Sequence, residues 1–258
     1  MGLALRGAFK VGPGFTWQYD LVSDVDFTTR PPFTLTYRIR TEARWSDGVP
    51  ITAQDFEFTH DTLLGLPEED RSGLGLEFVR RVTAVDAKTV RVVLRSRYGG
   101  WRGLFSRVLP RHALRGEDFS TVWLSGLSDP KTGRAIGSGP FLVGSWQRGR
   151  AVTFARNPRY WEPHTSHLDR IVLRFCESCG DPVAEQIEWL RARELDLAAF
   201  LGPSTNRCGS SVDSPASGCA SSLGRCGSTS ISARNAGDIQ PWRRKRSGAR
   251  LRTHSTAP

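Results

Sequence analysis

The chain has 258 residues with 38% hydrophobic side chains, enough for one large or two ordinary domains with a buried core. Its net charge of +10 is uneven, because residues 202–258 carry +7 and residues 1–201 only +3, which argues against a nucleic-acid-binding surface on the longer part. There is no apolar run long enough to cross a membrane, and the first residues do not follow the pattern of a signal peptide. From sequence alone we expect either a cytosolic chain or one whose export segment precedes Met1.

Strand-like alternation of apolar and polar residues dominates the chain up to residue 201. Phe33, Leu35, Tyr37 and Ile39 fall on one face of residues 33–40, which predicts a half-buried strand. The same pattern, with intervening turn residues, predicts two hairpins and one further strand. The predicted strands are 82–85, 90–94, 141–147, 151–156 and 168–175.

Two helices are predicted, at 53–64 and 183–193, from apolar residues at helical spacing. Thr52 followed three positions later by Asp55 resembles a capping box, with Asp in place of the usual Glu or Gln. We therefore expect the first helix to begin directly after Thr52. The mixture of strands and helices predicts an α+β or α/β fold with a strand majority.

The segment RWSDG precedes this helix and has the composition of a tight turn. Asp47 can bond nearby main-chain groups, and Gly48 accepts a positive φ. Trp45 can cover the apolar side of the turn. We interpret the cluster as a strand-to-helix turn with no catalytic role.

Residues 202–258 differ in composition from the rest of the chain. They hold 16 Ser or Thr, seven Gly and four Pro and show no periodic apolar face, so we predict a disordered tail. Arginine outnumbers lysine 32 to four in the whole chain, typical of a GC-rich gene, and we hypothesise a frameshift near Leu201. The basic run 241–246 is of the kind that binds nucleic acid or anionic lipid, but in such a tail we give it no function.

Four blocks of the sequence resemble one protein family. YRIRTEARWSDGVPITAQDFEFTHDTL is similar to the strand, turn and helix of the extracytoplasmic solute-binding proteins of ABC importers, family 5, which bind oligopeptides, dipeptides or nickel. AIGSGPFLVGSWQRGRAVTFARNPRYWEPHTSHLDRIVLRF resembles a second block of that family. AEQIEWLRARELDLAAF and VLPRHAL resemble two more.

The resemblance implies a fold and a function. Residues 1–201 would form the first lobe, up to the hinge, of a two-lobed type II periplasmic-binding-protein-like fold, in an incomplete copy. The protein would be the substrate-binding component of an ABC transporter, with peptides or other small solutes and membrane permease subunits as partners. It would be extracytoplasmic, would need no cofactor and would catalyse no reaction. The alternatives are a non-functional gene fragment and a basic-tailed nucleic-acid-binding protein.

The second block contains the candidate site residues. We propose Ser138, Gly139 and Phe141 as weak ligand-binding candidates, because the family's glycine-proline segment runs near the cleft. The structural interpretation is favoured: the glycines permit close main-chain approach and unusual φ, and Pro140 starts a strand. In the following corner, Asn157-Pro158 breaks a strand, and Tyr160 and Trp161 fill it with large rings.

Three further features leave alternatives open. Cys176 and Cys179 lack a second cysteine pair, so we favour a short-loop disulfide, with free thiols as the alternative and a metal site disfavoured. The pair His164 and His167 has no third ligand in view and is read as surface histidine. Arg193 stands where the family usually has glycine. If this position is left-handed, a residue other than glycine costs about 1 kcal/mol of stability there.

Overall fold

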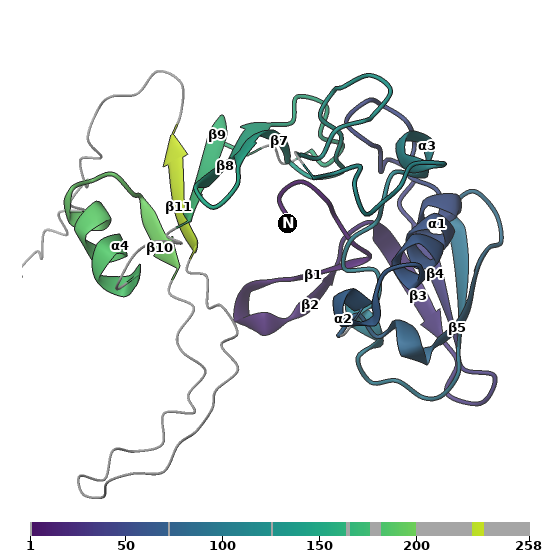
Figure 1. Cartoon of the computed structure of the whole chain (residues 1–258). Helices are drawn as coiled ribbons and strands as arrows, with labels where there is room; N and C mark the ends of the chain where they lie inside the picture. The colour runs from purple at the N-terminus through teal and green to yellow at the C-terminus, as the bar shows by residue number, and fades with distance from the viewer. Residues whose placement is uncertain are drawn as a thin grey trace, which may run out of the picture.

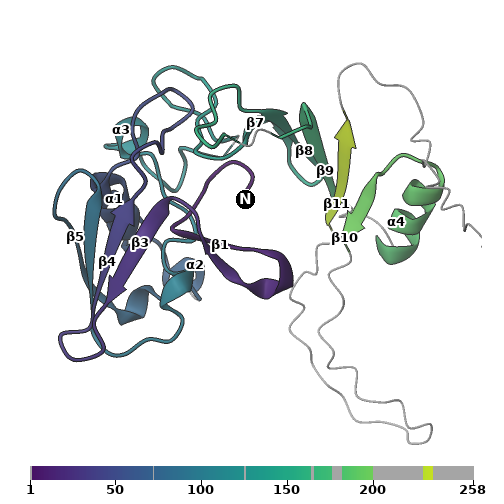
Figure 2. The same cartoon turned by 180° about the vertical axis from the view of Figure 1, so that it is seen from behind.

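The structure, a computed structural model, describes residues 2–71, 73–124, 126–163, 166–175, 182–199 and 229–234. Two antiparallel sheets form opposite ends of the molecule, and a short hairpin lies between them (Figures 1 and 2). The first sheet has the order β3 (Val22–Phe27), β4 (Thr34–Ile39), β6 (Thr89–Leu94), β5 (Val79–Ala84). The second has the order β10 (Leu197–Ala199), β11 (Thr229–Arg234), β9 (Arg170–Phe175), β8 (Ala151–Arg156), β7 (Phe141–Gln147).

The remaining elements are one hairpin and several helices. The hairpin consists of β1 (Phe9–Val11) and β2 (Trp17–Tyr19). The α-helices are α1 (Ala53–Leu64), α2 (Glu68–Arg71), α3 (Arg111–Leu114) and α4 (Pro182–Arg191), and the 3-10 helices are η1 (Pro13–Phe15), η2 (Leu76–Phe78) and η3 (Trp101–Gly103). No helix in the described part of the chain has the length and apolar character needed to span a bilayer.

The larger core lies under the first sheet. Leu35 pairs with Val92 across β4 and β6, and Tyr37 pairs with Val90, so apolar side chains gather on one face. All four are buried, and Phe56 of α1 is buried against the same cluster. The half-buried strand and the β5–β6 hairpin predicted from alternation are confirmed.

The smaller core belongs to the second sheet. Phe154 of β8 pairs with Ile171 of β9, and both pack with Phe141 of β7. Ala4, from the start of the chain, is fully buried in the same cluster. The predicted hairpin has the expected bounds on both strands.

Strand β11 differs from the sequence prediction, because it lies in the tail that we expected to be disordered. It pairs antiparallel with β9 on one side and β10 on the other. Within Thr229–Arg234 the predicted disorder is therefore wrong. The remaining residues of the tail lie outside the described ones.

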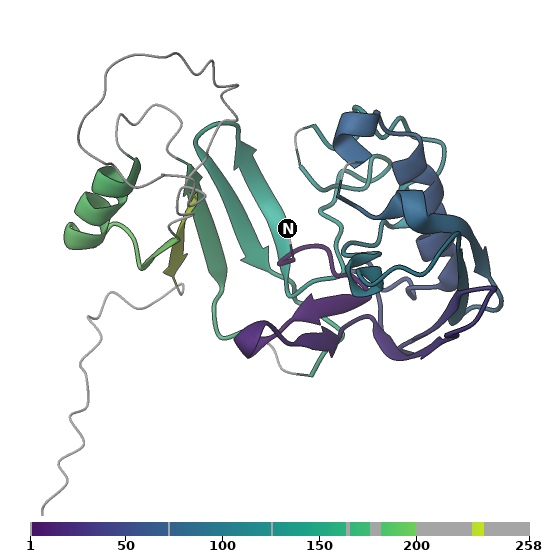
Figure 3. The ribbon, with the colours of Figure 1, turned by 90° about the horizontal axis from the view of Figure 1, so that it is seen from below.

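The β1–β2 hairpin lies between the sheets when the molecule is seen from below (Figure 3). Phe9 is buried in the larger core, whereas Trp17 and Tyr19 are each almost half exposed. The hairpin was not predicted, since its strands, FKV and WQY, are three residues long, too short for alternation to identify a strand.

Candidate functional site

The Trp-Ser-Asp-Gly turn has the geometry predicted for it. The Val49 N–H donates to Asp47 Oδ1 at 3.0 Å, and Gly48 has a φ of +97°. The Trp45 side chain is fully buried, and the Trp45 main-chain N–H donates to the Val49 carbonyl at 2.8 Å. These contacts give each residue a structural role.

The same turn contacts a segment about 90 positions later in the chain. The Ser46 N–H donates to the Gly137 carbonyl at 2.8 Å, and the Gly137 N–H donates to the Ser46 hydroxyl at 3.2 Å. On the turn's other side, His112 Nε2 lies 2.7 Å from Asp47 Oδ2. Sequence reasoning missed these contacts, because no local pattern signals a partner so distant.

The glycine-proline segment packs against the start of the chain. A Cβ at Gly139 would lie 2.1 Å from the Leu3 carbonyl oxygen, and one at Gly137 would lie 2.5 Å from the Ala4 oxygen. The predicted close main-chain approach is confirmed. The predicted unusual φ is wrong for both glycines, since neither has a positive φ.

The three ligand-binding candidates are interior residues in this structure. Ser138 is 0% exposed and Phe141 is 3% exposed, and Gly139 is buried between them. The Ser138 hydroxyl accepts the Arg6 N–H at 2.9 Å, and the Phe141 N–H donates to the Leu3 carbonyl at 3.1 Å. Their contacts position the start of the chain, and contact with a solute stays a prediction.

The Asn-Pro-x-Tyr-Trp corner supports this segment from behind. Asn157 is buried, and its side-chain amide donates to the Gly139 carbonyl at 2.9 Å. Its main-chain N–H donates to the Pro140 carbonyl at 2.8 Å. Trp161 Nε1 donates to the Ser138 carbonyl at 3.1 Å, and its ring packs against the larger core. Strand β8 ends at Arg156, directly before Asn157 and Pro158, and the filling of the corner by Tyr160 stays a prediction.

A charged cluster joins this corner to the β1–β2 hairpin. Arg6 pairs with Asp20 at 2.5 Å and lies 3.7 Å from Glu162. Burial raises the pKa of Asp20 in spite of the Arg6 charge. Burial alone would raise the pKa of Glu162, but the Tyr160 hydroxyl, Lys10 and Arg6 together hold it below its ordinary value. The cluster fixes the corner electrostatically.

The cysteine and histidine predictions are only partly within the described residues. Cys176, Cys179 and His164 all lie outside them. Across the part of the chain that is described, no group of three or more His, Cys, Asp or Glu side chains is arranged to hold a metal ion. Arg193 has a φ of +58°, so its left-handed conformation is confirmed.

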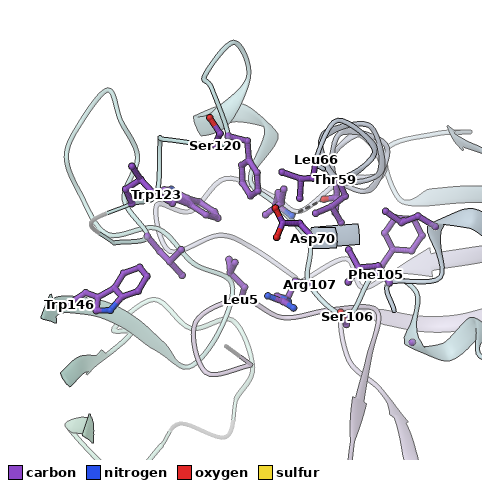
Figure 4. Close-up of a pocket in the computed structure, with 18 residues that line it drawn as sticks. Leu5, Thr59, Leu66, Asp70, Phe105, Ser106, Arg107, Ser120, Trp123 and Trp146 are labelled. Atoms are coloured by element: carbon purple, nitrogen blue, oxygen red, sulfur yellow. Dashed lines mark hydrogen bonds between the residues drawn. The ribbon is translucent and has the colours of Figure 1, made fainter. Parts of the chain in front are cut away.

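An apolar cavity of about 330 Å³ is the candidate binding site. Twelve of its eighteen lining residues are Leu, Phe or Trp. Figure 4 shows Trp123 and Trp146 on one side of the hollow, with Leu66, Thr59 and Asp70 on the other. Its volume is at the small end of the range for ligand pockets, about 300–1,000 Å³.

Among the described residues, two charged side chains, Asp70 and Arg107, line this cavity. Thr59 lines it too, but its hydroxyl donates to the Asp55 carbonyl at 2.6 Å and accepts the Leu109 N–H at 2.8 Å. An apolar hollow with few polar groups is typical of a site for a small ligand. None of the sequence-predicted ligand residues lines it.

The chain matches one family model. The model for bacterial extracellular solute-binding proteins, family 5 middle, covers residues 16–206. The fold class predicted from the sequence is confirmed by a solved structure, the periplasmic EDTA-binding protein EppA. EppA is 26% identical to this chain with a TM-score of 0.60, over 75% of this chain and 36% of its own.

Two curated mycobacterial proteins are also similar. LpqW of Mycobacterium tuberculosis strain H37Rv, named a probable monoacyl phosphatidylinositol tetramannoside-binding protein, is 34% identical over 174 residues, 62% of this chain and 26% of LpqW. The oligopeptide-binding protein OppA of the same strain is 31% identical over 185 residues, 67% of this chain and 30% of OppA. The chain thus spans less than a third of either relative's length.

Proposed function

Since the chain belongs to the bacterial extracellular solute-binding proteins of family 5, we propose that it captures a small solute outside the cytoplasmic membrane for an ABC importer. In this proposal membrane permease subunits receive the solute, and the chain itself catalyses no reaction. The observation that carries the proposal is the apolar cavity, whose lining residues other than Leu5 fall within the family match and which has the lining of a ligand site.

The class of solute is left open by the relatives. OppA is named for oligopeptides, EppA for EDTA, and LpqW for a monoacyl lipid. At this level we assign a peptide or a similar small solute. Ser138, Gly139 and Phe141 would then act from behind the site by holding the start of the chain, including Leu5, against the cavity.

One lobe by itself would bind a solute weakly. We assign residues 1–201 to the first lobe, and in a two-lobed protein both lobes contact the solute when they close over it. If the two lobes together bind at 1 μM, about −8 kcal/mol, half of that contact energy would leave roughly −4 kcal/mol, near millimolar. For the first lobe tested alone we therefore expect weak but saturable binding.

Arg107 provides a direct test. It is the positive charge of the cavity, and an anionic group on a solute would pair with it. In calorimetric titrations with short peptides and metal chelates, we expect Arg107→Ala to weaken binding by about tenfold, the effect of a lost charged hydrogen bond.

Arg97→Ala is the matched control, since Arg97 is exposed and does not line the cavity. It should leave the affinity unchanged. If no member of the panel binds saturably, or if both variants weaken binding equally, the proposal is wrong.

A further inference from the structure

A second hollow adjoins the apolar cavity. It has a volume of about 490 Å³ and shares Leu76 with the first. Helix α2 stands between the two: its Asp70 lines the apolar cavity, whereas its Arg71 lines the second hollow. A ligand that filled both would pass along this helix.

The second hollow is basic where the first is apolar. Arg71, Arg80 and Arg95 line it, against Glu68 and Glu77. Within the described residues, no ion pair joins these arginines to those two glutamates. The guanidinium groups can therefore turn remaining N–H donors toward an anion.

Arg71 gives a second indication of a missing partner. Its NH1 group donates to the Leu64 carbonyl at 3.4 Å, but its Nε is buried without a hydrogen-bond partner. A buried donor left unpaired costs about 1–3 kcal/mol, and more when the group is charged. An anionic group in the hollow would remove that cost.

The polar groups of the apolar cavity are largely committed already. The Ser120 hydroxyl donates to Asp118 Oδ1 at 2.6 Å, and Trp123 Nε1 donates to the Ser128 carbonyl at 2.9 Å. The Thr59 hydroxyl both donates and accepts within the protein. A peptide main chain brings one N–H and one C=O per residue, which would find few partners there. An alkyl chain has no N–H or C=O groups that would need a partner in the cavity.

We propose that the two hollows together bind a single-chain amphiphile with an anionic head. The alkyl chain lies in the apolar cavity, and the phosphate or carboxylate head meets Arg71, Arg80 and Arg95. If a methylene takes about the 30 Å³ of a water, the cavity holds a chain of about ten carbons. This inference rests on the proposed function and narrows its solute class.

Alkyl phosphates, used below their micelle concentration, are the probe. Binding to the full chain is followed by calorimetry and by intrinsic tryptophan fluorescence, to which Trp123 and Trp146 contribute among the eight tryptophans of the chain. We expect saturable binding with one site, tightening about fourfold for each methylene from octyl to decyl phosphate. Equal affinity for the two chain lengths would contradict the assignment of the apolar cavity.

Charge reversal tests the assignment of the head. Arg80 and Arg95 are exposed, so the double variant R80E/R95E should fold, as circular dichroism would check. It should bind decyl phosphate at least about tenfold more weakly, but decyl maltoside, with its neutral head, about as well as before. The control R81E/R91E changes two exposed arginines of the same hairpin that line neither hollow, and it should change neither affinity.

A tripeptide of leucine, run in the same assay, separates the outcomes. If the tripeptide binds saturably and decyl phosphate does not, the amphiphile proposal fails while solute capture stands. If neither binds, both fail. If decyl phosphate binds equally well to R80E/R95E, the head does not meet the arginines and the proposal is overturned.

Discussion

Arg193 lies two residues beyond the end of helix α4, at the position where the chain turns left-handed. The Glu194 N–H donates to the Trp189 carbonyl at 2.8 Å, and the Arg193 N–H donates to the Leu190 carbonyl at 3.1 Å. These two bonds define a Schellman motif, in which the left-handed position is usually glycine. Arginine here pays a steric cost that glycine would avoid, because its Cβ crowds the following carbonyl.

Arg193→Gly should therefore stabilise the protein. We expect the free energy of unfolding to rise by about 1 kcal/mol in a urea titration. Arg191→Gly is the matched control, two residues earlier and still helical. There glycine should lower the free energy of unfolding by about 1 kcal/mol. Equal effects of the two changes would show that the left-handed conformation carries no cost.

Gly139 shows a residue-scale limit of sequence reasoning. The sequence identified glycines where the main chain is approached closely, and the structure confirms that approach. It could not identify the partner, because the Leu3 carbonyl lies more than 130 positions earlier in the chain. The same limit explains why the packing role of Ser138 was not predicted.

At the scale of elements, Asp55 joins two helices. Its Oδ2 accepts the Thr52 N–H at 2.8 Å and completes the capping box of α1, and its Oδ1 accepts the Arg111 N–H at 2.9 Å at the start of α3. Burial raises the pKa of Asp55, although the N–H donors of Thr52 and Arg111 act in the opposite direction. Both oxygens of the Asp55 carboxylate thus accept main-chain N–H groups at helix starts, although burial disfavours its negative charge.

Asp55→Asn should be destabilising in a pH-dependent way. An asparagine side chain has one acceptor oxygen, so either the Thr52 N–H or the Arg111 N–H would lose its acceptor. We expect the free energy of unfolding to fall by about 1–3 kcal/mol. Because the folded-state pKa of Asp55 is raised, the folded protein keeps the carboxyl proton of Asp55 to a higher pH than the unfolded chain does. The free energy of unfolding of the wild type therefore falls as pH rises above about 4. The difference in free energy of unfolding between the wild type and Asp55→Asn should therefore become smaller from pH 3 to pH 7.

Asp86→Asn is a control for which the effect on the free energy of unfolding should change with pH in the opposite direction. The N–H groups of Lys88 and Thr89 and the Thr89 hydroxyl lower the pKa of Asp86 in the β5–β6 turn. Its contribution is present above the unfolded pKa and is lost as pH falls through the folded one. The deficit of this variant should therefore widen with rising pH. Unfolding followed at several pH values would contradict the assignment if both deficits moved in the same direction.

Most of the longer elements could be predicted from local patterns, and the failures have local causes. Strand β3 was missed because its register shifts between Val22 and Asp24, so its apolar residues do not follow a period of two. Helix α1 has the predicted bounds, but of the residues at helical spacing that predicted it, Phe56, His60, Leu63 and Leu64, only Phe56 and His60 are buried. Leu63 and Leu64 line the two hollows instead, beyond the edge of the core.

At the scale of the whole molecule, the cavity is assembled from distant segments. Leu5 comes from the start of the chain, Leu63 from α1, Trp123 from a long loop and Trp146 from β7 of the other sheet. No spacing in the sequence brings these four together. The fold class could thus be predicted from four blocks of resemblance, whereas the candidate site depends on tertiary contacts that also involve Leu5 and Trp123, which lie outside those blocks.

Uptake of a solute by this cavity can be tested by obstructing it. Gly103 lines it, and a Cβ there would meet no atom within 4 Å, so Gly103→Phe can obstruct the hollow without a clash at its own Cβ. Gly99→Phe is the matched control, equally uncrowded but outside the cavity.

The decisive measurement is a titration of the full chain and both variants with decyl phosphate and with the leucine tripeptide. We expect saturable binding of at least one probe by the wild type and by Gly99→Phe, and an affinity at least about tenfold lower in Gly103→Phe. Binding that is unaffected by Gly103→Phe, or an absence of saturable binding to either probe, would contradict it.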